Sequence, residues 1–202
     1  MDPDPINVYT DGACKNNGRT NAVAGIGVYF AEDDPRNVSQ RIDGKQTNNT
    51  AELLAILEVF NILRDPITNG DKVNIYTDSE YCIRCATTYG TKLKAKNWTN
   101  GSKKIPNLNL VQKLFLSSEK NPNVTFFHIR AHTSNQDTHS VSNFHADRLA
   151  NLAVGIVSST TVEPKKNYSD SKSISIDKTV NEKILEKLDD IEKRLIILEN
   201  KL

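Results

Sequence analysis

The sequence predicts an α/β domain, in which helices pack on a mixed β-sheet, followed by a separate C-terminal helix. In the first part of the chain, β-branched segments come first and alternate later with amphipathic helical segments, an order typical of helices covering a mixed sheet. A polar stretch at residues 158–176 then interrupts the apolar pattern. With 202 residues, the chain has room for one domain of about 150 residues and a smaller appendage.

The expected strands are short runs of β-branched and aromatic residues. Four runs are clear, at residues 6–10, 25–30, 73–77 and 124–129, and residues 36–42 form a weaker one. The second run is entered through small residues, which suit a turn or a close approach of two backbones.

The clearest expected helix spans residues 51–63. Leu53, Leu57 and Phe60 recur in it at helical spacing, Thr50 is a candidate N-cap, and Asp65 with the following proline is a candidate stop. Further helices are expected at residues 79–86, 107–117 and 143–157.

The last part of the chain divides into a linker and a helix. Residues 158–176 are rich in Ser, Thr, Lys, Pro and Asn, which is the composition of a flexible linker, so the first folded domain is expected to span residues 1–157. In residues 177–202, six apolar residues recur at alternating steps of four and three, the spacing of a coiled-coil seam: Ile184, Leu188, Ile191, Leu195, Leu198 and Leu202. We expect this helix to form a homo-oligomer; the alternative is a helix that docks on the first domain of its own chain.

Composition limits the compartment and the partners. The net charge is only +1, so any attraction for a polyanion must be local. No apolar run is long enough to cross a bilayer and the N-terminus has no signal-peptide pattern, so an intracellular, soluble protein without a membrane partner is expected, in the cytoplasm or the nucleus. Three cysteines form no disulfide framework, and Cys82 and Cys85 suit buried thiols better than zinc ligands.

Four acidic residues are candidates for one site. Asp11 and Asp78 each follow a β-like tripeptide, Glu52 lies in the first turn of the clearest helix, and Asp147 lies near the start of the last helix. Each acid alone is compatible with a helix cap or a solvated turn. Four carboxylates without matching Lys or Arg favour a hard divalent cation, Mg²⁺ or Mn²⁺, and two such ions can drive hydrolysis of a phosphodiester.

Five segments together resemble the type 1 ribonuclease H family, in particular its eukaryotic-type members. They are YTDGAC (9–14), AGIGVYF (24–30), QTNNTAEL (46–53), YTDSEY (76–81) and HADRLAN (145–151). The resemblance runs from residue 6 to about residue 157 and implies the RNase H-like fold, a five-stranded mixed sheet flanked by helices. It also implies an endonuclease that hydrolyses the RNA strand of RNA–DNA hybrids and leaves 5′-phosphate and 3′-hydroxyl ends. Asp11, Glu52, Asp78 and Asp147 match the family's catalytic quartet, which binds two Mg²⁺ ions.

The resemblance also assigns a role to His132, since a histidine at this place assists proton transfer or product release in the family. The chain departs from the family just beyond this residue. The segment between His132 and Asp147 is several residues longer than expected, and Phe144 and His145 stand where members carry acids. His139 and His145 are therefore alternatives to His132.

Contacts with the RNA strand are expected from amide side chains near the acids. A 2′-hydroxyl both donates and accepts a hydrogen bond, and an amide side chain can accept the first and donate the second. The resemblance assigns this contact to Asn17, Asn48 and Asn49, and Cys14 lies near them. The alternative interpretation, that asparagines form turns, is strongest for Asn17.

Contacts with the DNA strand are expected from a basic stretch and a small phosphate pocket. Residues 92–104 carry five lysines, including Lys94 and Lys96, around Trp98, and no acid. Such a run is often only a solvated face, but the resemblance makes it the basic protrusion that grips DNA. The resemblance assigns the phosphate pocket to Lys45, Thr47 and Asn107.

Two other functions are compatible with the same residues. One is a binding module for hybrids that does not cleave them, against which the intact quartet argues. The other is a nuclease of the same fold that cuts DNA, which the asparagines near the site disfavour.

Overall fold

The computed structural model describes residues 3–130 and 137–156. His132, the expected linker at 158–176 and the expected helix at 177–202 lie outside these ranges. The described part contains a five-stranded sheet in the order β3-β2-β1-β4-β5, which confirms the mixed sheet. β1 pairs with β2 antiparallel and with β4 parallel, β2 pairs with β3 antiparallel, and β4 pairs with β5 parallel. The strands are β1 (Ile6–Lys15), β2 (Val23–Tyr29), β3 (Val38–Arg41), β4 (Val73–Thr77) and β5 (Val124–His128).

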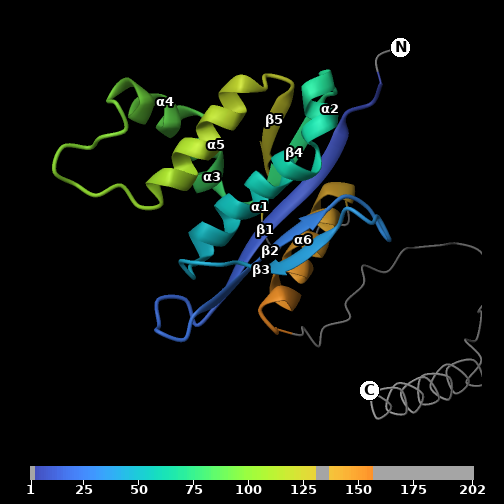
Figure 1. The fold of residues 1–202 in the computed structure, drawn as a ribbon. Coiled ribbons are helices and arrows are strands. Elements are labelled where there is room, and N and C mark those ends of the chain that lie inside the picture. The colour runs from blue at the N-terminus through green and yellow to red at the C-terminus, as the bar shows by residue number, and fades with distance from the viewer. Residues whose placement is uncertain (1–2, 131–136, 157–202) are drawn as a thin grey trace, which may run out of the picture. The chain divides into compact units, whose positions relative to one another are not determined.

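Helices cover both faces of this sheet. α1, α3 and α5 lie on one face and α6 lies on the other (Figure 1). The helices are α1 (Asn48–Ile62), α2 (Arg64–Asn69), α3 (Glu80–Ala86), α4 (Thr88–Ala95), α5 (Leu108–Lys120) and α6 (Thr138–Ala153). None of the helices within the described ranges is both long and apolar enough to span a lipid bilayer.

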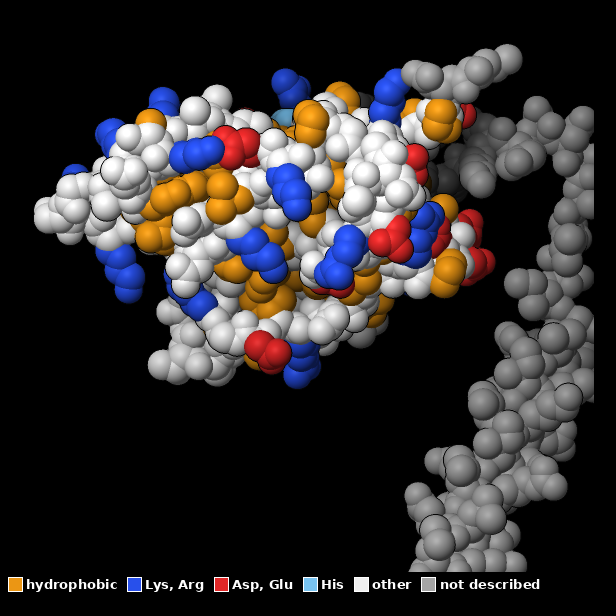
Figure 2. Space-filling view, turned by 45° about the horizontal axis from the view of Figure 1, so that its top comes forward, with side chains coloured by type: hydrophobic (Ala, Val, Ile, Leu, Met, Phe, Trp, Pro, Cys, Tyr) orange, Lys and Arg blue, Asp and Glu red, His pale blue; other side chains and the backbone are white. Residues whose placement is uncertain are grey.

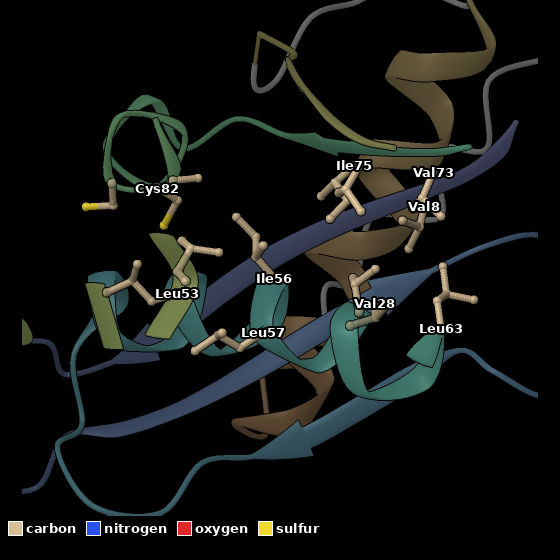
Figure 3. Close-up of a cluster of buried hydrophobic side chains, with 14 of the residues drawn as sticks. Val8, Val28, Leu53, Ile56, Leu57, Leu63, Val73, Ile75 and Cys82 are labelled. Carbon is tan, nitrogen blue, oxygen red and sulfur yellow. The ribbon is translucent and has the colours of Figure 1, made fainter. Parts of the chain in front are cut away.

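The main hydrophobic core lies between the sheet and α1. Val8 and Ile75 point from the sheet toward Leu53 and Ile56 of α1, and all four side chains are fully buried (Figure 3). Fully burying an aliphatic side chain of this size stabilises a fold by about 1.5–3 kcal/mol. α1 is apolar on most of its surface because α5 covers the side that the sheet leaves open. This core fixes the start of α1, and with it Glu52, against the sheet.

α6 approaches the other face closely because β2 carries glycines there. A Cβ atom on Gly27 would lie 2.1 Å from the backbone oxygen of Ala146 and 2.6 Å from the backbone nitrogen of Ala150. Ala146 and Ala150 are themselves fully buried. Small residues on both partners therefore let the two backbones touch and fix the height of α6 above the sheet.

Several helix boundaries differ from the prediction. The side chain of Thr47, not that of Thr50, caps α1. The chain does not stop at Asp65 but continues as α2, because a proline in the first helical turn needs no N–H partner. α4 was not predicted as a helix.

The largest difference concerns α6, which begins at Thr138 and not at residue 143. The carboxylate of Asp137 accepts hydrogen bonds from the backbone N–H groups of His139 and Ser140, and so caps the helix. Asp147 consequently lies in the middle of α6. Part of the expected long loop after His132 is therefore extra helix.

Candidate active site

The strand pairing brings the first two acids together. β1 and β4 are parallel neighbours with Thr10 opposite Thr77, so the residues that follow, Asp11 and Asp78, lie side by side. The expected strand at residues 6–10 placed Asp11 just beyond its end, and the structure corrects this placement. β4 ends at Thr77, whereas β1 continues to Lys15, so Asp11 is in the middle of its strand.

Glu52 and Asp147 reach this place from opposite faces of the sheet. A Cβ atom on Gly12 would lie 2.3 Å from the backbone nitrogen of Glu52, so α1 rests directly on β1. Because α1 begins at Asn48 and not at residue 51, Glu52 lies in its second turn and not, as predicted, in its first. From the other face, α6 brings Asp147 within hydrogen-bonding and electrostatic reach of Asp11. The fold therefore gathers the four predicted acids in one region.

Asp11 is the most confined member of this group. Its side chain is only 9% exposed, and the backbone N–H of Gly12 donates to Oδ1 over 2.7 Å. Burial raises the pKa of Asp11 well above its ordinary value, and the charges of Asp78 and Asp147 raise it further. The site thus places a carboxyl group that is shielded from water beside two other acids.

Glu52 is held in place by two neighbouring side chains. The Ser79 hydroxyl donates to Oε2 over 2.5 Å, and Asn48 Nδ2 donates to Oε1 over 2.7 Å. Burial raises the pKa of Glu52, and the charge of Asp78 raises it as well, whereas these hydrogen bonds lower it. Glu52 is therefore oriented before any ligand arrives.

Three further residues that the sequence analysis did not single out support the acids. Asn151 Nδ2 donates to Asp147 Oδ1 over 2.8 Å, and His128 Nε2 donates to the backbone oxygen of Asp78 over 3.2 Å. Ser79, the third, also caps α3. Its position directly after Asp78 was a usable signal, and so was the one-turn spacing of Asp147 and Asn151. No local pattern marked His128.

The donor set fits a hard divalent cation. As the side chains stand, no three His, Cys, Asp or Glu groups in the described ranges are close enough together to hold one ion. The group nevertheless offers four carboxylates, and the charges that act on Asp11 are those of other acids. Oxygen donors of this kind suit Mg²⁺ or Mn²⁺ rather than zinc, and a divalent ion would relieve their repulsion.

Metal-free protein should lose stability as the pH rises. The folded-state pKa of Asp11 lies above the ordinary value of 3.8, so the folded state holds this proton more tightly than the unfolded chain. Stability therefore falls from about pH 4 up to the raised pKa and stays low above it. Bound Mg²⁺ at about 100 times its Kd should add about 2.7 kcal/mol. We expect Mg²⁺ to raise Tm more at pH 8 than at pH 5 in calorimetry with and without EDTA; equal shifts at both pH values would contradict this account.

An aromatic row crosses the α6 face of the sheet beside the acids. Tyr76 stacks between Tyr9 and Phe127, with ring centroids 4.9 and 5.0 Å apart. His139 Nδ1 lies 3.0 Å from the Tyr9 hydroxyl, and the His145 ring stacks on Tyr29. The two alternatives to His132 are thus engaged in ring contacts that join α6 to the sheet.

The residues predicted to contact RNA lie around the end of β1 and at the start of α1. Asn48 is already bonded to Glu52, whereas Asn49 and Asn17 are exposed. Cys14 is half-buried, and its thiol donates to the backbone oxygen of Gln46 over 3.6 Å, which joins the end of β1 to the segment before α1.

The residues predicted to contact DNA fall into two groups. Lys45 Nζ donates to Asn107 Oδ1 over 3.0 Å, so these two residues of the expected phosphate pocket lie together, and Thr47 lies at the start of α1. Beyond them, the edge of Trp98 meets Phe115, and Lys94 pairs with Glu119 over 2.6 Å. Lys96 is exposed. Trp98 and Lys94 therefore each contact a side chain of α5 in the protein without substrate.

Cys82 and Cys85 are fully buried thiols on α3, as predicted. Burial raises the pKa of Cys85 to about 11 and that of Cys82 also rises, chiefly because of burial. Both groups are therefore protonated near neutral pH and act as small apolar side chains.

Comparisons with known proteins agree with this geometry. Residues 3–155 match the RNase H family. The chain is 40% identical over 146 residues to "Ribonuclease H" of Schizosaccharomyces pombe, which is 71% of this chain and 50% of that protein. It is 36% identical over 144 residues to "Ribonuclease H1" of Mus musculus, 71% of this chain and 48% of that protein. The chain thus spans about half the length of these two relatives.

A solved structure gives the same result. LC11-RNase H1, isolated from compost by a metagenomic approach, has a TM-score of 0.51 and is 26% identical, and the match covers 75% of this chain and 96% of that one. Together with the family match, these relatives confirm what the five segments predicted. The chain belongs to the ribonuclease H family, as a type 1 member.

Proposed function

We propose that the chain is an endonuclease that hydrolyses the RNA strand of RNA–DNA hybrids and leaves 5′-phosphate and 3′-hydroxyl ends. The observation that carries this proposal is the buried carboxylate of Asp11 beside Asp78 and Asp147, with Glu52 reaching the same place from the other face. Membership of the ribonuclease H family supports the substrate and the reaction.

The four acids would hold two Mg²⁺ ions, with Mn²⁺ as the alternative. When bound, such ions activate a water molecule and stabilise the leaving oxygen of a phosphodiester. The chain's own part is to keep the carboxylates in position before the ions arrive. The Gly12 N–H orients Asp11, Ser79 and Asn48 orient Glu52, and Asn151 orients Asp147.

His132 would handle the proton in this reaction. Hydrolysis that leaves a 3′-hydroxyl requires a proton on the departing 3′ oxygen, and a histidine titrates near neutral pH. His139 and His145 make ring contacts with Tyr9 and Tyr29, which supports His132 over these two residues for the task.

Recognition of the hybrid would be divided between its two strands. Asn17, Asn48, Asn49 and Cys14 would contact the RNA strand, where a 2′-hydroxyl distinguishes RNA from DNA. Contacts with the DNA strand would come from the phosphate pocket and from the basic stretch, where lysines confer salt-dependent affinity. These residues are Lys45, Thr47, Asn107, Trp98, Lys94 and Lys96.

One gel assay tests this proposal. The purified chain is mixed with a labelled RNA–DNA hybrid, duplex RNA or duplex DNA, each with Mg²⁺ or with EDTA. We expect cleavage of the hybrid alone, only with Mg²⁺, and products that a phosphatase alters at their 5′ ends. Binding of the hybrid without cleavage would favour a silent binding module, and cleavage of duplex DNA would favour a DNA nuclease.

We also propose that residues 177–202 form a homo-oligomer, on the ground of their heptad pattern. Deleting them should leave a monomer that still cleaves short hybrids but binds long ones about tenfold or more weakly, because linked sites raise the effective concentration. Sedimentation of both proteins at micromolar concentration measures the state. A full-length chain that sediments as a monomer would overturn this proposal.

A further inference from the structure

A groove of about 810 Å³ lies between α1 and α5, on the face of the sheet opposite α6. Each helix contributes a stripe with the spacing i, i+3, i+4, i+7, so the two stripes face each other along about two turns. The stripe of α1 continues into α2. The groove residues from these stripes, called the basic groove below, are Leu57, Phe60, Asn61 and Arg64 on one side and Lys113, Leu116, Ser117 and Lys120 on the other.

The basic groove combines an apolar floor with a cationic rim. Leu57 and Ile67 form buried parts of its lining, whereas Leu116 remains 42% exposed, one of the largest exposures of an apolar side chain in the described ranges. Arg64, Lys113 and Lys120 also line the groove, and no acid does. The space-filling view shows apolar side chains among lysine and arginine side chains on this side of the molecule (Figure 2).

Hydrogen bonds made by two asparagines hold part of the groove lining in place. Asn123 Nδ2 donates to the backbone oxygens of Ile67 and Asp71, which ties the loop after α2 to the start of β5. Asn121 Nδ2 donates to the backbone oxygen of Ser117. The shape therefore exists before any ligand binds, which lowers the entropic cost of binding.

We propose that the basic groove binds a short acidic segment of a partner protein that carries a large apolar side chain. The apolar floor would take the side chain, and the three cations would pair with the flanking carboxylates. A stripe from i to i+7 is about 10 Å long, which matches about four residues of an extended peptide.

This charge pattern distinguishes the proposed occupant from two others. A nucleic acid strand would satisfy the cations, and its bases could stack on Phe60, but it would bring no aliphatic side chain for Leu116. The chain's own residues 177–202 contain seven acids and six bases, so they offer the rim almost no net charge. An acidic segment with an apolar anchor satisfies both parts of the groove.

The position of the groove lets a partner bind without blocking the acids. Glu52 lies in the second turn of α1, and Arg64, the first residue of α2, lies twelve residues further along the chain, which corresponds to about 18 Å along a helix. A partner bound there would hold the protein near its site of action while the carboxylates stay accessible.

The test uses the full chain and a fluorescein-labelled peptide, Glu-Asp-Leu-Phe-Asp-Glu. Anisotropy should report binding that weakens about tenfold or more in Arg64→Glu and in Leu116→Asp, because one removes a rim charge and the other an apolar contact. Arg84→Glu, an exposed charge reversal on α3, should bind the peptide as the unchanged chain does. All three variants should keep the circular dichroism spectrum and the hybrid cleavage of the unchanged chain.

Several outcomes would overturn the proposal. Equal binding by all variants, or no binding by the unchanged chain, would remove the groove as the site. A peptide with Ala-Ala in place of Leu-Phe that binds equally well would show that only charge is read. If labelled single-stranded DNA or a labelled peptide of residues 177–202 competes with the acidic peptide for the unchanged chain, and itself binds Arg64→Glu more weakly, the groove belongs to that occupant instead. If the unchanged chain cleaves the hybrid but does not bind the peptide, the groove proposal fails while the proposed nuclease function stands.

Discussion

Replacement of Asp11 by asparagine should reduce cleavage of an RNA–DNA hybrid by about a thousandfold or more while the fold persists. Asp11 is the acid that both Asp78 and Asp147 act upon, so it lies at the centre of the carboxylate group. A divalent ion at a phosphodiester supplies several kcal/mol of transition-state stabilisation, and each 1.4 kcal/mol is worth about a factor of ten in rate. Single-turnover kinetics with saturating Mg²⁺ would measure the loss.

The same variant carries its own control for folding. Asparagine keeps the shape of the side chain but removes a buried negative charge from beside two others, so in EDTA at pH 8 its Tm should equal or exceed that of the unchanged chain. Asp65→Asn, at an exposed position on α2, should leave both rate and Tm unaltered. Full activity in Asp11→Asn would refute the assignment of the site.

Gly27→Ala should be strongly destabilising and should also reduce activity. The added Cβ would stand 2.1 Å from the backbone oxygen of Ala146, and a helix backbone cannot yield as a flexible side chain can. Overpacking of a core costs about 1–3 kcal/mol and sometimes more, and relief here requires α6 to move away from β2. Because Asp147 lies one residue after Ala146, the same movement would withdraw it from Asp11.

Substitution of a second glycine serves as a control, because it measures the cost of replacing glycine where no clash occurs. Gly155 has a φ of +72° and nothing nearer than 4.0 Å to its Cβ position, so Gly155→Ala should cost about 1 kcal/mol for backbone strain alone. Chemical denaturation and hybrid cleavage of both variants would show the difference. If Gly27→Ala is no less stable and no less active than Gly155→Ala, the close approach of α6 is not what positions Asp147.

The elements predicted best from the sequence are those whose residues favour that secondary structure intrinsically and are also buried in the folded protein. β4 has the predicted bounds because Val73 and Ile75 are β-branched residues in a central strand whose inner positions are fully buried. α4 escaped prediction because only Gly90 and Leu93 of its eight residues are buried, which makes no recognisable stripe. The polar first turn of α6 was missed for the same reason, although Asp137 offered a capping signal.

The four acids could be located from sequence because each stands in a distinctive segment, but their surroundings could not. The Tyr9 hydroxyl and His139 are 130 residues apart, and their contact depends on the direction in which α6 crosses the sheet. The pairing of Lys94 with Glu119 depends likewise on how α4 lies beside α5. The sequence of residues 92–104 shows that the segment is basic, but it does not show which of its side chains contact other parts of the protein.

The helices on the two faces of the sheet are held in different ways, and this difference affects the acids proposed to be catalytic. α1 is embedded in the large aliphatic cluster, whereas α6 is held by alanines against glycines and by the row of rings. Helices with few large apolar contacts open at the lowest free energy in native-state hydrogen exchange. We therefore expect the amide protons of α6 to exchange before those of α1, so that Asp147 lies in the less protected of these two helices. A cation shared between Asp147 and the strand acids would join that helix to the rest and slow its opening.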